Sequence, residues 1–154
     1  MNRQFMQEAI NLAMKNIGNG GGPFGAVIVK DGKIIATGAN RVTSNNDPTA
    51  HAEVCAIRNA CNELQTFNLE GCEIYSSCEP CPMCLGAIYW AHLDKLYYAC
   101  DKNDAADAGF DDSFIYKELE LNREDRALKS EILLPQEAKA VFESWKAKEN
   151  KTEY

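Results

Sequence analysis

The chain has 154 residues, of which 45% are hydrophobic and 25% charged, values that exclude the disordered and fibrous classes of protein. Its 16 lysines and arginines against 23 aspartates and glutamates give a net charge of −7, which argues against a nucleic-acid partner and favours a small, uncharged or weakly charged substrate. We interpret residues 1–154 as one domain, large enough to bury a core without a structural metal, so any metal is expected to be catalytic.

The pattern of apolar residues indicates strands and helices that alternate along the chain. Helices are predicted over residues 3–17, 51–64, about 80–92 and 136–148. Strands are predicted over residues 24–29, 33–38, 72–77 and 96–99. Asp31-Gly32 predicts a hairpin between the first two strands, residues 41–50 are interpreted as a loop, and 101–109 as loop and short helix. The alternation predicts a layered α/β domain with an antiparallel hairpin followed by βα units.

The N-terminal segment does not fit a signal peptide, because Arg3 is its one basic residue before Gln7 and Glu8 interrupt the apolar run. No stretch approaches the roughly 20 apolar residues that cross a bilayer, so no membrane partner is expected. Seven cysteines without a secretory signal favour a reducing compartment, and roles in metal binding or catalysis over disulfides. We therefore expect a cytoplasmic protein.

Two short runs contain residues that bind metals: His51-Ala52-Glu53 and Pro80-Cys81-Pro82-Met83-Cys84, each at a predicted helix start. Cys81 and Cys84 are three residues apart, so their sulfur atoms share one face of a helix. A helix N-terminus also favours the thiolate form that binds metal. With His51 as the third ligand, a tetrahedral zinc ion keeps its fourth position open for water, which is the arrangement of catalytic zinc sites. The spacing therefore predicts one catalytic Zn²⁺ per subunit.

Glu53 is not needed as a ligand, and its predicted role is proton transfer. It follows His51 by two residues, and at the mouth of a helix both side chains can turn toward one cavity. A carboxylate placed there can take a proton from a zinc-activated water and deliver it to a substrate. The order H-x-E followed by P-C-x-x-C is the signature of the zinc deaminases, in which this glutamate is the general acid and base.

The cysteine spacing has two other interpretations. Residues 78–84 also spell C-x-x-C-x-x-C, as in iron–sulfur proteins, but Ile88 lies where a fourth cysteine would be needed. A structural site of four cysteines would need Cys72 or Cys100, and it would leave the histidine and the glutamate without a role. The cysteines outside the motif are expected to be small core residues, namely Cys55, Cys61, Cys72 and Cys100, while Cys78 is expected at a strand end near the site.

With both motifs in place, the sequence resembles the cytidine-deaminase-like superfamily and, within it, the small bacterial guanine deaminases. The resemblance spans nearly the whole chain. Its diagnostic runs are NDPTAHAE over residues 46–53, SCEPCPMC over 77–84 and AGFDDSFIY over 108–116. The first two runs are shared with tRNA adenosine deaminases, whereas the third run and the tyrosine-ended tail favour guanine as substrate.

This resemblance implies a three-layer α/β/α sandwich around a five-stranded mixed sheet. It also implies hydrolytic deamination of guanine to xanthine and ammonia, a step of guanine catabolism, in which Glu53 moves a proton from water to the ring nitrogen and assists departure of ammonia. The partner implied is a second copy of the chain. In that homodimer the C-terminal segments are exchanged and Tyr154 closes the neighbour's active site, whereas composition alone predicts a frayed tail.

Matching family positions imply further site residues. Asn40 is expected to hydrogen-bond the purine, Phe24 to pack on its ring, and Ala52 to contact it; Asp112 is expected to assist proton transfer or contact the base. Three of these residues also have a purely structural interpretation. Asn40 could support a turn, Phe24 could belong to the core, and Asp112 could cap a helix.

Several rival functions stay open on the sequence alone. Guanosine deamination would differ in the room left for a ribose. Deamination of tRNA adenosine requires a basic C-terminal surface, whereas residues 117–154 mix many acids with their lysines. Cytosine deamination is a third rival, and a non-enzymatic zinc-binding module is a fourth that would leave Glu53 without a purpose.

Overall fold

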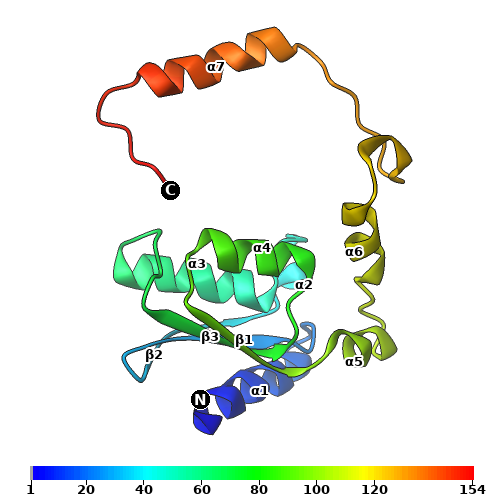
Figure 1. The fold of residues 1–154 in the computed structure, drawn as a ribbon. Coiled ribbons are helices and arrows are strands. Elements are labelled where there is room, and N and C mark those ends of the chain that lie inside the picture. The colour runs from blue at the N-terminus through cyan, green and yellow to red at the C-terminus, as the bar shows by residue number, and fades with distance from the viewer. Residues whose placement is uncertain (1) are drawn as a thin grey trace. The chain divides into compact units, whose positions relative to one another are not determined.

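The computed structural model describes residues 2–154, which form two compact units divided between Ser113 and Phe114. The first unit is built on a four-stranded sheet with the order β2-β1-β3-β4 (Figure 1). β1 pairs antiparallel with both of its neighbours, and β3 pairs in parallel with β4. The strand bounds are Gly25–Lys30 for β1, Lys33–Ala39 for β2, Cys72–Cys78 for β3 and Lys95–Cys100 for β4.

The predicted hairpin between β1 and β2 is confirmed. Asp31 and Gly32 have φ angles of 49° and 71°, and positive φ at both central residues is what a two-residue hairpin turn of type I′ requires. The following residues 41–50, expected as loop, also contain a four-residue helix, α2 (Val42–Asn45). The α/β class of the fold is therefore confirmed, with one short element added.

The expected fifth strand is wrong, because the described residues form a sheet of four strands. Directly after β4 the chain enters helix α5 (Lys102–Asp107). The Asp101 carboxylate accepts hydrogen bonds from the backbone N–H groups of Asn103 at 2.8 Å and Asp104 at 3.1 Å, while the Asp104 carboxylate accepts from the Asp101 N–H at 2.9 Å. This reciprocal capping stabilises a helix start, and a second helix follows at α6 (Ser113–Glu120).

Helices cover both faces of the sheet (Figure 1), because successive side chains of β1 point to opposite sides. Helix α1 (Arg3–Gly18) lies on one face, and α3 (Ala52–Leu64) and α4 (Pro82–Trp90) lie on the other. The apolar cluster under α1 contains Ala9, Val27, Val29 and Tyr75. The larger cluster under α3 and α4 includes Ala26, Ile28, Ala52, Ala56, Ile74 and Ile88.

Gly38 of β2 allows α3 to approach the sheet closely. A Cβ atom at this position would clash with the main chain of Ala52 and Ala56 in the first turns of α3. Because Ala52 follows His51 directly, the glycine helps to set the position of a predicted zinc ligand.

The second unit contains most of α6, a short 3-10 helix (Arg123–Asp125) and α7 (Pro135–Ala147), the last close to the expected bounds. Within this unit the Glu118 carboxylate accepts a hydrogen bond from the Ala127 N–H at 2.8 Å. No residue of α6 or α7 is buried. Among the residues that the structure describes, no helix is long and apolar enough to cross a membrane.

Candidate metal centre and active site

The three predicted zinc ligands lie together at the N-terminal ends of α3 and α4, two helices that contact one another. His51 is the N-cap of α3 and Cys81 the N-cap of α4, both with extended backbone. Pro82 occupies the first turn of α4, where a missing N–H is tolerated and a fixed φ suits the helix. Cys84 is buried in the same turn. The two helix starts therefore present all three ligands to one point.

The distances between the ligand atoms fit a zinc ion. Nδ1 of His51 lies 3.5 Å from Sγ of Cys81 and 3.5 Å from Sγ of Cys84, and the three atoms all lie within 4.8 Å of one another. Typical zinc bonds to nitrogen and sulfur, at a tetrahedral angle, would separate these atoms by about 3.6 Å. One nitrogen and two sulfur atoms are also a donor set that zinc prefers, and they leave a fourth position for water.

The two thiols of this group ionise unequally. A hydrogen bond from Cys84, assisted by His51, lowers the pKa of Cys81 to about 4 against the opposing effect of burial. The hydrogen bond to Cys81, together with burial, raises the pKa of Cys84, and the hydrogen bond with Cys81 raises the pKa of His51. Coordinating thiols are deprotonated outright, so a bound divalent ion would remove the proton of Cys84 as well.

Glu53 lies in the first turn of α3 and is 5% exposed. Its Oε1 accepts a hydrogen bond of 2.9 Å from Oγ of Ser76. Burial raises the pKa of the Glu53 carboxyl, although bonds from its own backbone, Ser76 and Cys84 act in the opposite direction. A buried carboxyl with a raised pKa beside a metal-ligand group is suited to accept and return a proton near neutral pH. Sequence reasoning missed Ser76, since no spacing links it to Glu53.

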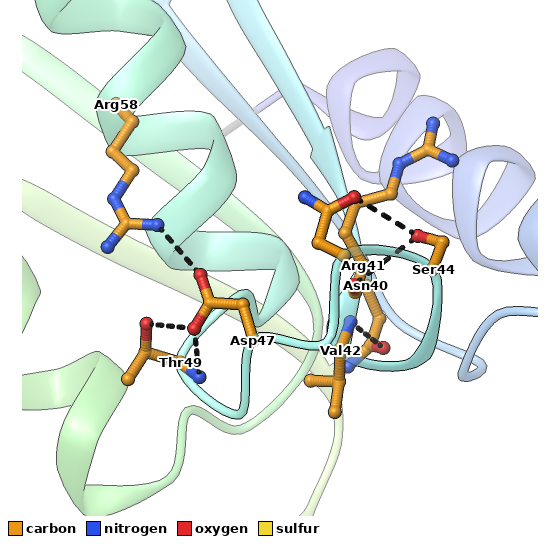
Figure 2. A network of polar contacts seen from close by, with 8 residues as sticks. Asn40, Arg41, Val42, Ser44, Asp47, Thr49 and Arg58 are labelled. Atoms are coloured by element: carbon orange, nitrogen blue, oxygen red, sulfur yellow. Dashed lines mark hydrogen bonds and ion pairs between the residues drawn. The ribbon is translucent and has the colours of Figure 1, made fainter.

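Polar contacts order the loop that precedes His51 (Figure 2). Oδ1 of Asp47 accepts hydrogen bonds from the N–H of Thr49 at 2.8 Å and from its hydroxyl at 2.6 Å, and these bonds lower the pKa of Asp47. Oδ2 of Asp47 pairs with Arg58 of α3 at 3.5 Å. The N–H of Arg41 donates to the carbonyl of Ala50 at 2.8 Å. These contacts connect both ends of the loop and fix the residue before the zinc ligand.

Three predicted substrate contacts lie at the ends of the adjacent elements. Asn40 follows β2 and is buried; its N–H donates to the carbonyl of Phe24 at 3.2 Å. Oδ1 of Asn40 accepts from the N–H of Val42 at 3.2 Å, whereas its Nδ2 donates no hydrogen bond within the described residues. The ring of Phe24 packs edge-to-face on Phe110 at 4.9 Å between centroids, and Ala52 is fully buried. Asn40 therefore supports the turn through its Oδ1, while its Nδ2 remains available to donate a hydrogen bond to a ligand.

The other two predicted site residues fall in different units. Asp112 is half-buried in the first unit, where burial and then the charge of Cys81 raise the pKa of its carboxyl. Asp112 thus lies within electrostatic reach of the ligand group. Tyr154 belongs to the second unit and is 77% exposed. Its expected role over a neighbour's site stays a prediction.

Cys78 ends β3 and its thiol is not part of the ligand group, both as expected. Burial raises the pKa of Cys78 to about 11, and the neutral thiol donates to the carbonyl of Asp101 at 3.5 Å. Of the four cysteines expected in the core, Cys72 is buried, Cys55 and Cys61 are half-buried, and Cys100 is exposed. The expectation is confirmed for Cys72 and wrong for Cys100. The described residues therefore give no support to an iron–sulfur run.

Comparison with known proteins agrees with this geometry. Guanine deaminase of Bacillus subtilis (strain 168) is 54% identical over 151 residues, which cover 97% of each chain. An X-ray structure of guanine deaminase from Bacillus subtilis superposes with a TM-score of 0.97 at 54% identity and covers 100% of this chain and 99% of its own. A structure of guanine deaminase from Nitrosomonas europaea is 36% identical, with a TM-score of 0.68, over 70% of this chain and 63% of its own.

A more distant likeness extends to another class of deaminase. The tRNA-specific adenosine deaminase of Aquifex aeolicus (strain VF5) is 44% identical over 99 residues, which cover 64% of this chain and 66% of that protein. The family model described as the cytidine and deoxycytidylate deaminase zinc-binding region matches residues 1–100, which include the whole ligand group. The chain therefore belongs to the cytidine and deoxycytidylate deaminase zinc-binding family.

Proposed function

We infer that this protein catalyses the zinc-dependent hydrolysis of guanine to xanthine and ammonia. The observation that carries this inference is the buried carboxylate of Glu53 beside His51, Cys81 and Cys84. The substrate follows from the relative that matches nearly the whole chain, a guanine deaminase 54% identical over 97% of its length.

The ligand group and the acid–base residue have separate tasks. When bound, zinc supplies Lewis-acid chemistry that brings the pKa of a water in its open position close to neutrality. Glu53 takes the proton of the attacking water and delivers it to the ring nitrogen beside the carbon that bears the amino group. The second proton of the water passes from the new hydroxyl to the amino group, again through Glu53. The C–N bond then breaks, ammonia leaves, and the oxygen of water remains on the ring as the new carbonyl of xanthine. A reducing compartment such as the cytoplasm suits this site, because all seven cysteines are free.

We propose that Asn40, Phe24, Ala52 and Asp112 bind the base. The unused Nδ2 of Asn40 can donate a hydrogen bond to a purine acceptor, and the half-buried ring of Phe24 offers a surface for stacking. The proximity of Asp112 to the charge of Cys81 supports a place near the reacting end of the base. Ala52 directly follows a zinc ligand, so its main chain lies beside the same position.

Deamination of tRNA adenosine is the rival that a comparison favours, because the Aquifex relative is 44% identical. That likeness covers 64% of the chain, whereas the likeness to guanine deaminase covers 97%. The net charge of −7 also opposes a polyanionic substrate. Guanine is therefore the favoured substrate, and guanosine differs from it only by a ribose that the pocket would have to admit.

We propose in addition that two chains form a homodimer in which residues 114–154 of one chain cover the active site of the other. This segment leaves large apolar side chains at the surface, such as Leu128 at 81% and Leu133 at 84% exposure. Tyr89, in the last turn of the helix α4 that begins at the zinc ligands, is 75% exposed. Apolar surface of this extent commonly marks an interface. Light scattering should give twice the mass of one chain, and a monomer would contradict the proposal.

The substrate is tested by ammonia release from the zinc-loaded protein with guanine, guanosine, adenine, cytosine and a tRNA, each offered separately. Guanine alone should react at an appreciable rate. Strong release from guanosine or cytosine would keep the zinc chemistry but overturn the substrate. Bound zinc without turnover of any of these compounds would favour a zinc-binding module.

A further inference from the structure

Ser76 joins β3, one of the two inner strands of the sheet, to Glu53. It lies on β3, in register with Ala26 of β1 and Tyr98 of β4, and it is 1% exposed. Its Oγ donates the 2.9 Å hydrogen bond to Oε1 of Glu53, across 23 residues of sequence. Apart from this contact, α3 and this face of the sheet meet mainly through alanine and aliphatic side chains. The hydroxyl is therefore a polar group placed among apolar ones, directly against a buried carboxylate.

The bond between Ser76 and Glu53 is shielded from solvent at both ends. Ser76 is 1% exposed and Glu53 is 5% exposed, so water has little access to take the place of the serine hydroxyl at Oε1. The 2.9 Å length is that of a well-formed hydrogen bond from a hydroxyl to a carboxyl oxygen. The contact therefore fixes one oxygen of a carboxyl group that has to be oriented toward a substrate.

We propose that Ser76 is a positioning residue for Glu53, an inference that rests on the proposed function. Its hydroxyl occupies Oε1 and keeps the carboxylate from rotating, so that Oε2 stays turned to the substrate and carries the proton. A serine hydroxyl can donate to Oε1 whether or not Oε2 is protonated, so the contact persists through both halves of the transfer. Small errors in the placement of a catalytic group cost large factors in rate, which gives this contact its importance.

Serine-to-alanine variants at two adjacent positions test the proposal. A hydrogen bond to a charged group stabilises it enough that losing the bond from Ser76 should slow the reaction step about 10- to 100-fold. Ser76→Ala should therefore lower kcat by that factor, with KM changed less than about threefold and zinc content unchanged. Ser76→Thr, which keeps the hydroxyl, should recover most of kcat. The control is Ser77→Ala: Ser77 is also buried, but its Oγ accepts from the N–H of Gly25 at 3.1 Å on the other face. A kcat for Ser76→Ala within threefold of that for Ser77→Ala would overturn the proposal.

A second measurement needs no substrate. Urea unfolding of the zinc-loaded wild type, Ser76→Ala, Glu53→Ala and the double variant gives the coupling between the two side chains. We expect the effect of the double variant on the unfolding equilibrium constant to differ about tenfold from the product of the two single effects. Additive free-energy changes would contradict an interaction between Ser76 and Glu53. If the wild type deaminates guanine and Ser76→Ala is unaffected, the inference fails while the proposed function stands. If the wild type does not act on guanine, the proposed function fails and the coupling still decides whether Ser76 holds Glu53.

Discussion

Replacing Glu53 with glutamine separates proton transfer from every other property of the site. The amide has nearly the same size as the carboxyl, and its oxygen can still accept the 2.9 Å hydrogen bond from Ser76. None of the three ligand atoms is changed, so zinc content should stay at that of the wild type. The amide cannot take a proton from water, however, and burial to 5% exposure leaves little room for solvent to replace it.

The expected loss follows from the size of general acid–base catalysis. Such groups contribute about 10²- to 10⁴-fold, so the activation free energy for Glu53→Gln should rise by about 2.7–5.5 kcal/mol. Xanthine formation is followed by ultraviolet absorbance, and metal content is measured on the same samples. The matched control is Glu63→Gln, an identical charge change at an exposed position near the end of α3. Activity of Glu53→Gln within tenfold of the wild type would refute the assignment of Glu53 as the proton carrier.

Three further variants test a zinc ligand, the packing of α3 on the sheet and the role of the C-terminus. Cys84→Ser should lose most of the bound zinc and the activity together, and zinc that remains at wild-type stoichiometry would contradict its role as a ligand. Gly38→Ala should lower the free energy of unfolding, measured in urea, by about 1–3 kcal/mol, because the added Cβ clashes with the main chain of Ala52. The control Gly86→Ala adds its Cβ to open space. Equal urea midpoints for the two variants would count against the close approach of α3 to β2. Removal of Tyr154 and its neighbours should lower kcat at unchanged zinc content, and unaltered kinetics would exclude a lid.

The local elements could be predicted because each depends on a short stretch of sequence. Asp31-Gly32 predicts its hairpin because a type I′ turn needs positive φ at both positions, as observed. Pro82 suits the first turn of a helix, which fixed the start of α4 and with it the spacing of the two sulfur ligands. The metal centre was thus accessible from sequence, since its ligands are all residues at helix starts.

What could not be predicted depends on contacts between distant parts of the chain. The hydrogen bond between Ser76 and Glu53 joins a strand to a helix 23 residues away in the sequence, and no periodicity or spacing of residues predicts this contact. The fifth strand was expected from resemblance, but the capping box at Asp101 directs the chain into a helix at that point. The exposure of Cys100 likewise follows from its place at the end of an edge strand, which composition does not reveal.

Zinc titration of the metal-free protein, with guanine as substrate, tests the central claim most directly. Chelator-treated protein should form no xanthine, and activity should rise in proportion to added zinc until one ion is bound per chain, because a single group of three ligands holds it. Full activity in the metal-free protein, or one zinc bound per chain without conversion of guanine, would contradict zinc-dependent guanine deamination.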